Sequence, residues 1–202
     1  CNLNYLAHLV LSGDDPEIMT GNFMGDFLTR SQLKGKTDNF VIGYDLHMFI
    51  DKYTDADTDV DAVISLFRQK HGKYAVVIAD IIFDFFLCNN WQMFYTTTLD
   101  EFMNSVYHKI ETQLHLIPEK VSSLIRRMIA GNFIEKYKTL DGLHFITQKM
   151  DQRASFSAGF VESLSIVKDN ELFINDKFLT FYLKLKSATE QQLLILQSGM
   201  KS

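Results

Sequence analysis

Residues Gly43 to Asp55, GYDLHMFIDKYTD, carry two patterns at helical spacing. Four residues at intervals of three and four predict the apolar stripe of an α-helix: Leu46, Phe49, Ile50 and Tyr53. On another side of the same helix, His47, Asp51 and Asp55 follow one another at intervals of four. An imidazole one turn from a carboxylate can bind a metal ion, act as an acid–base pair, or form a solvent-exposed surface pair.

A second stretch, Ile78–Leu87 (IADIIFDFFL), places Asp80 and Asp84 one helical turn apart in an otherwise apolar segment. Ionised carboxylates are costly to bury unless a cationic group lies opposite. Two such helices facing each other would gather His47, Asp51 and these two aspartates around one point. A helix whose polar stripe faces solvent is the alternative interpretation.

Composition indicates one helical domain spanning residues 1–202. The chain has only two prolines and ten glycines, and no linker rich in Pro, Gly or Ser divides it. Its periodicity predicts an all-α bundle of about eight helices. The net charge of −5 argues against a nucleic-acid surface. Only two cysteines, Cys1 and Cys88, and no run approaching 18 apolar residues predict a cytoplasmic protein without disulfides or a membrane span.

Periodicity and capping residues set the expected helices. After a short segment, Asn4–Ser12, we expect them over residues 15–28, 39–54, 59–69, 74–94, 101–115, 118–137 with a disturbance near Gly131, 140–150, 155–166 and about 175–196. The alternating acidic run from Asp55 to Asp61 lacks the central Gly and final Glu of a calcium loop, so we interpret it as acidic helix starts. Gly21 and Gly25 indicate either tight helix packing or close approach of a ligand.

Several common catalytic signatures are absent. The chain has no GxGxxG, GxxxxGK[ST], CxxC, HExxH or GxSxG pattern. These absences argue against nucleotide-dependent oxidoreductases, P-loop NTPases, zincins and α/β-hydrolases. Residues 120–138 instead carry a local excess of positive charge, which is either a solvated helix face or an anion-binding patch: Lys120, Arg126, Arg127, Lys136 and Lys138 against Glu135.

Four short motifs occur in order: Asn4–His8 (NYLAH), Gly21–Phe27 (GNFMGDF), Gly43–Asp55, and Asp80–Trp91 with Asp84, Phe86 and Leu87. Together they resemble the acyl carrier protein phosphodiesterase family, whose members show NFLAH, GNxxxDF, GxxxHxxID…TD and DHFL…W. The resemblance covers about the first 95 residues well. It is weaker at Tyr137, Met150, Arg153 and Ser163-Leu164.

The resemblance implies an all-helical, HD-domain-like phosphoric diester hydrolase. The family's named activity removes the 4′-phosphopantetheine arm from holo-acyl carrier protein, an acidic protein substrate of fatty acid and lipid metabolism, and depends on Mn²⁺. Carboxylates and imidazoles also suit Mn²⁺ or Mg²⁺ on chemical grounds. Carried over by position, His47 and Asp84 are the first expected metal ligands, Asp26, Asp51 and Asp80 are ligands or supporting carboxylates, His8 is a proton-transfer group or further ligand, and Asn22 hydrogen-bonds a phosphate oxygen.

Two positions depart from the family pattern. Phe85 stands where the family usually has a His, and Asp45 stands where some members have one. Two alternatives therefore stay open: a related phosphohydrolase with a small phosphoester substrate, and a non-catalytic helical binding protein with a degenerate site. An acidic carrier protein also needs a basic docking patch. Residues 120–138 are the first candidate, and Lys34 with Lys36 the second.

Overall fold

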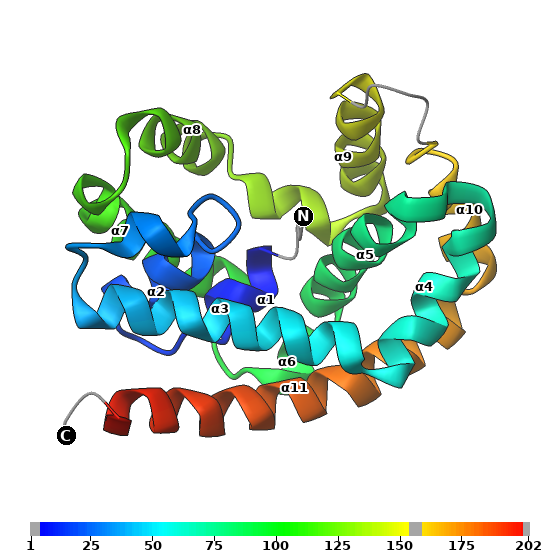
Figure 1. The fold of residues 1–202 in the computed structure, drawn as a ribbon. Helices are drawn as coiled ribbons and strands as arrows, with labels where there is room; N and C mark the ends of the chain where they lie inside the picture. Colours follow the sequence, from blue (N-terminus) through cyan, green and yellow to red (C-terminus); the bar gives the residue numbers. More distant parts are fainter. Residues whose placement is uncertain (1–4, 154–158, 200–202) are drawn as a thin grey trace.

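All regular secondary structure among the residues described by a computed structural model, 5–153 and 159–199, is helical (Figure 1). The prediction of an all-α fold is confirmed. The α-helices are α1 (Tyr5–Val10), α2 (Pro16–Phe23), α3 (Asp38–Ala56), α4 (Thr58–His71), α5 (Ala75–Asn89), α6 (Trp91–Phe94), α7 (Leu99–Gln113), α8 (Glu119–Ala130), α9 (Leu140–Arg153), α10 (Ser163–Asp169) and α11 (Glu171–Gly199). Four 3-10 helices join them: η1 (Arg30–Leu33), η2 (Gly72–Tyr74), η3 (Leu114–Leu116) and η4 (Phe133–Lys138).

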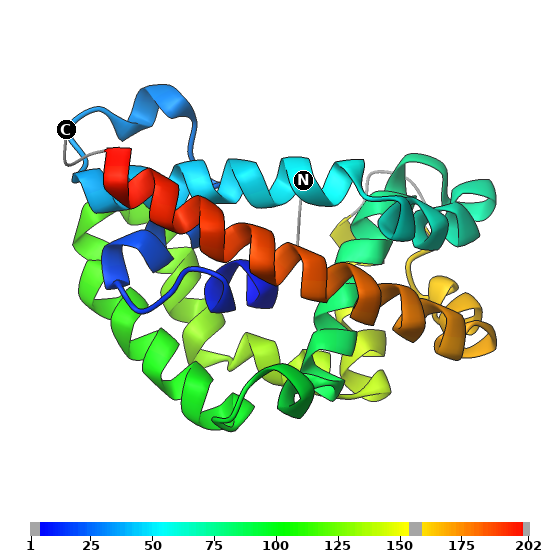
Figure 2. The same cartoon turned by 90° about the horizontal axis from the view of Figure 1, so that it is seen from below.

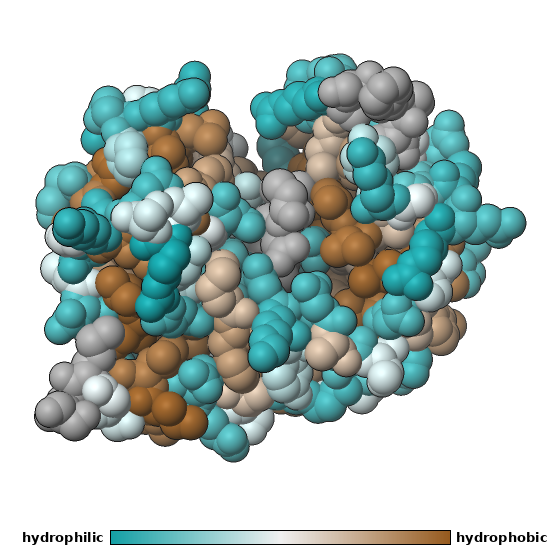
Figure 3. Space-filling model, in the orientation of Figure 1, coloured by the Kyte–Doolittle hydropathy of each residue, from teal (hydrophilic) through white to brown (hydrophobic). Residues whose placement is uncertain are grey.

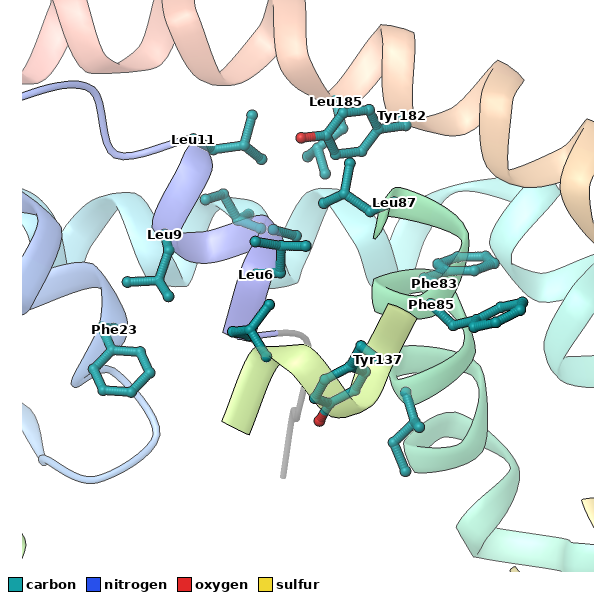
Figure 4. Close-up of a cluster of buried hydrophobic side chains, with 14 of the residues drawn as sticks. Leu6, Leu9, Leu11, Phe23, Phe83, Phe85, Leu87, Tyr137, Tyr182 and Leu185 are labelled. Carbon is teal, nitrogen blue, oxygen red and sulfur yellow. The ribbon is translucent and has the colours of Figure 1, made fainter. Parts of the chain in front are cut away.

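Helix α1 has only six residues, yet it lies in the middle of the bundle. So short a helix is not stable alone, so packing must hold it in place. Leu6 and Leu9 are fully buried. Around α1, Figure 4 shows Leu87 of α5 and both Tyr182 and Leu185 of α11. Helix α11 runs the length of the molecule beneath α3 and α1 (Figure 2). The residues of α1 are therefore held in place by side chains from the longer helices α5 and α11.

Helices α2 and α3 form the most extensive contact between two elements. They cross where Gly21 faces Gly43, so that a side chain at either position would collide with main-chain atoms of the other helix. The tight packing expected as one interpretation of Gly21 is confirmed. This close approach brings the end of α2 against the middle of α3, where His47 lies.

Several predicted helices end earlier or divide. Helix α2 stops at Phe23 rather than at residue 28, and a turn follows. The predicted helix 74–94 divides at Asn90, whose side-chain amide donates to the Phe86 carbonyl oxygen and to Asn175 of α11. The disturbance predicted near Gly131 in the helix over 118–137 is confirmed, because the helix divides at Asn132, which has a left-handed backbone with φ of 44°. Residues 1–4 and the expected helix start at residue 155 lie outside the described residues.

Acidic residues begin helices as predicted. The Asp57 carboxylate accepts hydrogen bonds from the main-chain N–H groups of Asp59 and Val60 at the start of α4. Lys184 of α11 pairs with both Asp57 and Asp59, at 2.7 and 2.9 Å. These carboxylates are therefore occupied by helix caps and lysines, which agrees with the interpretation of the run as helix starts. Among the described helices, none is both long and apolar enough to cross a membrane.

Candidate metal centre

Three side chains from two helices meet inside the bundle. His8 of α1 stacks on His47 of α3, with ring centroids 4.1 Å apart and an interplanar angle of 20°. The Nε2 atoms of both rings lie 3.2 Å from carboxylate oxygens of Asp51, which is one turn after His47. Ligand atoms of these three residues all lie within 4.8 Å of one another. This spacing is compatible with one shared metal ion.

Asn22 of α2 orients both imidazoles. Its side-chain Oδ1 lies 2.7 Å from His8 Nδ1, and its main-chain oxygen lies 2.9 Å from His47 Nδ1. The Asn22 amide in turn donates to the His8 carbonyl oxygen and to Ser12 Oγ, at 3.0 and 2.9 Å. Because both Nδ1 atoms face oxygen acceptors, each neutral ring carries its proton there and presents the Nε2 lone pair to Asp51. Second hydrogen bonds of this kind are typical of metal-ligating histidines.

Gly25 leaves the space that the His47 ring fills. A Cβ atom at Gly25 would collide with ring atoms of His47, and with no main-chain atom of another helix among its nearest contacts. Gly25 therefore makes room for a side chain of the site, whereas the interpretation of this spacing as close approach of a ligand stays a prediction.

Charges around the imidazoles differ. Burial lowers the pKa of His47, but the contacts with Asp26 and Asp51 outweigh burial and raise it to about 9. Burial also lowers the pKa of His8, and for that ring the Asp51 carboxylate does not restore it. Burial raises the pKa of Asp51, but its contacts with His47 and His8 lower that pKa by more, so it lies well below its ordinary value and this carboxyl is ionised. The cluster thus carries an ionised carboxylate between a readily protonated ring and a neutral one.

The donor atoms fit a divalent cation. His8 Nε2, His47 Nε2 and Asp51 Oδ1 are buried and have no hydrogen-bond partner among the described residues, although the rings touch the carboxylate. Buried polar atoms normally have such partners. Two imidazole nitrogens and a carboxylate oxygen suit Mn²⁺, Zn²⁺ and other divalent ions, so the donor set alone does not select the metal.

Two more predicted carboxylates lie beside this cluster. Asp26 Oδ1 lies 3.6 Å from His47 Nε2, and its side chain is 22% exposed, which places it at the solvent side of the cluster. Asp80 of α5 is buried, and its Oδ2 has no hydrogen-bond partner among the described residues. Burial, followed by the charges of Asp51 and Asp84, raises the pKa of Asp80 well above its ordinary value. Asp80 therefore faces the same acidic region.

Asp84 makes different contacts. Its carboxylate accepts hydrogen bonds from the main-chain N–H groups of Leu6 and Ala7, at 3.1 and 3.3 Å, in the first turn of α1. These N–H groups have no partner within their helix. Burial raises the pKa of Asp84 to about 8, and the two hydrogen bonds act in the opposite direction. Asp84 thereby attaches α1, and with it His8, to α5.

The two positions that depart from the family pattern lie outside the cluster. Phe85 is buried, and its ring packs edge-on against Phe86 at 5.3 Å. Neighbouring helical residues point about 100° apart, so Phe85 does not share the Asp80–Asp84 side of α5. The carboxylate of Asp45 pairs with Arg30. The group formed by His8, His47 and Asp51 assembles without either residue.

Sequence reasoning found the ionisable members of the cluster but missed Ser12, which bonds the Asn22 amide. Gly25 was singled out as a position of close approach, but its contact with His47 was not predicted. The only sequence signal for Ser12 is its position four residues after His8, where its hydroxyl donates to the His8 carbonyl oxygen at 2.6 Å. The orienting function of the Asn22 main-chain oxygen has no sequence signal, because every residue carries that atom.

Comparison with known proteins agrees with the resemblance of the motifs. The family model described as acyl carrier protein phosphodiesterase matches residues 3–185. A protein of that name from Serratia proteamaculans (strain 568) is 26% identical over 193 residues, covering 95% of this chain and all of the relative. Another of that name, from Yersinia pestis, is 25% identical over 181 residues, covering 89% of this chain and 94% of the relative. No solved structure is significantly similar. The chain belongs to the acyl carrier protein phosphodiesterase family.

Proposed function

We propose that this protein is a cytoplasmic, metal-dependent phosphodiesterase that removes the 4′-phosphopantetheine arm from holo-acyl carrier protein. The observation that carries the proposal is the convergence of His8 Nε2, His47 Nε2 and the Asp51 carboxylate oxygens, buried and facing one another, with ligand atoms of the three residues all within 4.8 Å. The names of the relatives supply the substrate class. In this reaction water adds to phosphorus, the bond between phosphorus and the serine oxygen breaks, and the serine oxygen receives a proton.

The proposed ligands are His8, His47 and Asp51, with Asp26 and Asp80 as nearby carboxylates that complete or charge-balance the site. A bound Mn²⁺ or Mg²⁺ ion supplies a Lewis acid for the phosphoryl oxygens and a means of activating water. Asp26 is the most exposed of the five, so we assign it the proton exchange with substrate and solvent. The negative charge on Asp51 balances part of the charge of the cation.

Two residues receive revised functions in this proposal. Asn22 is fully buried, and its amide is used by His8 and Ser12, so we assign it the orientation of the imidazoles in place of a phosphate contact. Asp84 is attached to the first turn of α1, so we assign it the positioning of His8 in place of direct metal ligation. The first residues to substitute are therefore the three whose ligand atoms lie within 4.8 Å of one another: His8, His47 and Asp51.

The experiment is intact-mass analysis of holo-acyl carrier protein incubated with this protein and Mn²⁺. Loss of the phosphopantetheine mass, prevented by a chelator and by His47→Ala, is the expected result. A Lys168→Glu variant, altered at an exposed residue of α10, should retain the activity and controls for handling. Stoichiometric Mn²⁺ binding with no mass change would favour a small phosphoester substrate instead. No mass change and no bound metal would favour a non-catalytic binding protein.

A further inference from the structure

A groove of about 910 Å³ opens between α8 and α9. Figure 3 shows the molecule hollowed at the top between the α8 side and the α9 side. Helix α8 forms one wall, α9 forms the other, and η4 lies between them. The groove is lined mainly by large apolar side chains, among them Leu124, Met128, Phe133, Phe145, Ile146 and Met150. Leu124 and Phe145 are 38% and 46% exposed, so the apolar surface reaches the rim.

Four cations stand along this groove. Arg127 and Lys136 come from the α8 and η4 side, and Lys149 and Arg153 come from α9. All four are exposed, and no carboxylate is among the described residues that line the groove. Lys136 and Lys149 both lie over the Phe145 ring, with Nζ atoms 5.7 and 5.6 Å from its centroid. Two of the cations therefore contact an aromatic ring and not a carboxylate of the described residues.

Only two of the basic residues in segment 120–138 line the groove, namely Arg127 and Lys136. Arg126 pairs with Glu119 at 3.4 Å, and Lys138 pairs with Glu135 at 2.8 Å. Arg127 and Lys136, by contrast, form no ion pair with a carboxylate among the described residues, and neither do Lys149 and Arg153. Since the whole chain carries a net charge of −5, this groove is a local positive surface on an acidic protein.

Tyr5 connects the groove to the metal centre. It lines the groove, and its ring contacts Phe133 at 5.6 Å between centroids. Burial and the charges of Asp26 and Asp84 raise the pKa of Tyr5, while the charge of Arg153 lowers it, so Tyr5 lies within electrostatic range of both regions. His8 follows Tyr5 by three residues on the same side of α1. One end of the groove therefore lies about one helical turn from His8.

Building on the proposed function, we propose that the groove between α8 and α9 is the docking surface for the carrier protein, and that it receives an acidic amphipathic helix of that partner. The apolar floor would take the apolar side of the helix, and the four cations would meet its carboxylates. Recognition of a helix in a groove combines such apolar anchors with charges at the rim. A fatty acyl chain would use the floor but leave the cations without anionic partners, so charge favours the helix.

The test measures binding without chemistry. Apo-acyl carrier protein, which lacks the arm, is titrated against the wild-type protein and the variants Arg127→Glu and Lys149→Glu, one from each wall. Each reversal should weaken binding about 5- to 10-fold, and wild-type affinity should fall as salt is raised. Lys168→Glu makes the same charge change on exposed α10, outside the groove lining, and should bind like wild type.

Steady-state kinetics distinguish failure of the docking proposal from failure of the proposed phosphodiesterase activity. With holo-carrier protein, the groove variants should raise KM with kcat nearly unchanged. With bis(p-nitrophenyl) phosphate and Mn²⁺, they should match wild type, because this small diester does not use the groove. Binding that is sensitive to the reversals without any hydrolysis would support docking and count against the phosphodiesterase activity.

Three outcomes would overturn the docking proposal. The first is hydrolysis of holo-carrier protein with the same KM in wild type and both groove variants. The second is binding of apo-carrier protein that is absent in wild type or equally strong in all variants. The third is an affinity that depends on the length of an acyl chain on the arm but not on the charge reversals, which would assign the groove to the acyl chain.

Discussion

The side chain of Asn22 holds the imidazole of His8 through Oδ1 and Nδ1 atoms 2.7 Å apart, in a fully buried contact. The main-chain oxygen of Asn22 does the same for His47 at 2.9 Å. One residue on α2 therefore sets the orientation of two rings that come from α1 and α3. The rest of the cluster depends on this contact, because only correctly turned rings present both Nε2 atoms to Asp51.

Asn22→Ala should weaken Mn²⁺ binding about 10- to 100-fold, the usual effect of losing a hydrogen bond behind a ligating histidine. It should also lower the free energy of unfolding by about 1–3 kcal/mol, because buried polar groups lose their partners. Isothermal titration and thermal unfolding measure the two effects. Ser12→Ala is the matched control, since it removes a partner of the amide but touches neither ring. Equal Mn²⁺ affinity in Asn22→Ala and wild type would contradict the assignment.

Asp84 should act through α1 rather than through the metal. Asp84→Ala leaves the buried N–H groups of Leu6 and Ala7 without their acceptor, so it should cost about 1–3 kcal/mol of stability per lost partner. Asp84→Asn keeps one carbonyl oxygen as an acceptor and should retain measurable Mn²⁺ binding. Complete loss of metal by a folded Asp84→Asn protein, as judged by circular dichroism and titration, would instead identify Asp84 as a ligand.

The metal-free protein should lose stability as pH rises from about 6.5 to 9. The pKa of His47 is raised to about 9 in the folded state by Asp26 and Asp51, which outweigh burial. Its contribution is therefore fully present below the unfolded pKa of about 6.5 and is lost as pH passes 9. We expect a loss of about 1–3 kcal/mol in urea unfolding across this range.

Mn²⁺ should reverse this dependence. A ligating imidazole must be deprotonated, so metal binding and the stabilisation it gives should increase from pH 6.5 to 9. His47→Gln serves as the control, because it removes both the titration and the ligand. Metal-free stability that stays constant over this interval would show that folding does not raise the pKa of His47.

Gly25→Ala should damage the site more than the fold. The new methyl group would displace the His47 ring, so Mn²⁺ affinity should fall at least about 10-fold while the helical content is retained. Gly43→Ala provides the contrast, because its methyl group would collide with the main chain of α2 and should lower the melting temperature strongly. Similar unfolding by Gly25→Ala and Gly43→Ala would contradict this distinction.

Phe85→His, which restores the residue usual in the family, should leave Mn²⁺ affinity unchanged within about twofold, because the cluster forms without residue 85. A polar ring in this buried position should cost about 1–3 kcal/mol of stability. Activity on holo-carrier protein is the second measurement. An increase of tenfold or more in kcat would show that Phe85 replaces a group that the reaction uses.

Much of the fold follows from local patterns in the sequence. The caps at Asp15 and Asp57, and the Thr98–Glu101 pair at the start of α7, act within a few residues of their position, so sequence alone predicts them. The break at Asn90 was missed because the apolar pattern predicts a continuous helix there. The Asn90 amide bonds both to Phe86, four residues earlier, and to Asn175, 85 residues away, and local spacing does not reveal the second contact.

The sequence by itself determined that His47 and Asp51 share one side of a helix, because an α-helix fixes the geometry of residues four apart. Tertiary structure alone decided that His8 of α1 lies against Asp51 of α3, that Asp84 attaches α1 to α5, and that Arg127 and Lys149 line opposite walls of a groove. These relations join different helices. Their distances depend on how apolar surfaces and glycine contacts set the helices against one another, and local spacing does not contain that information.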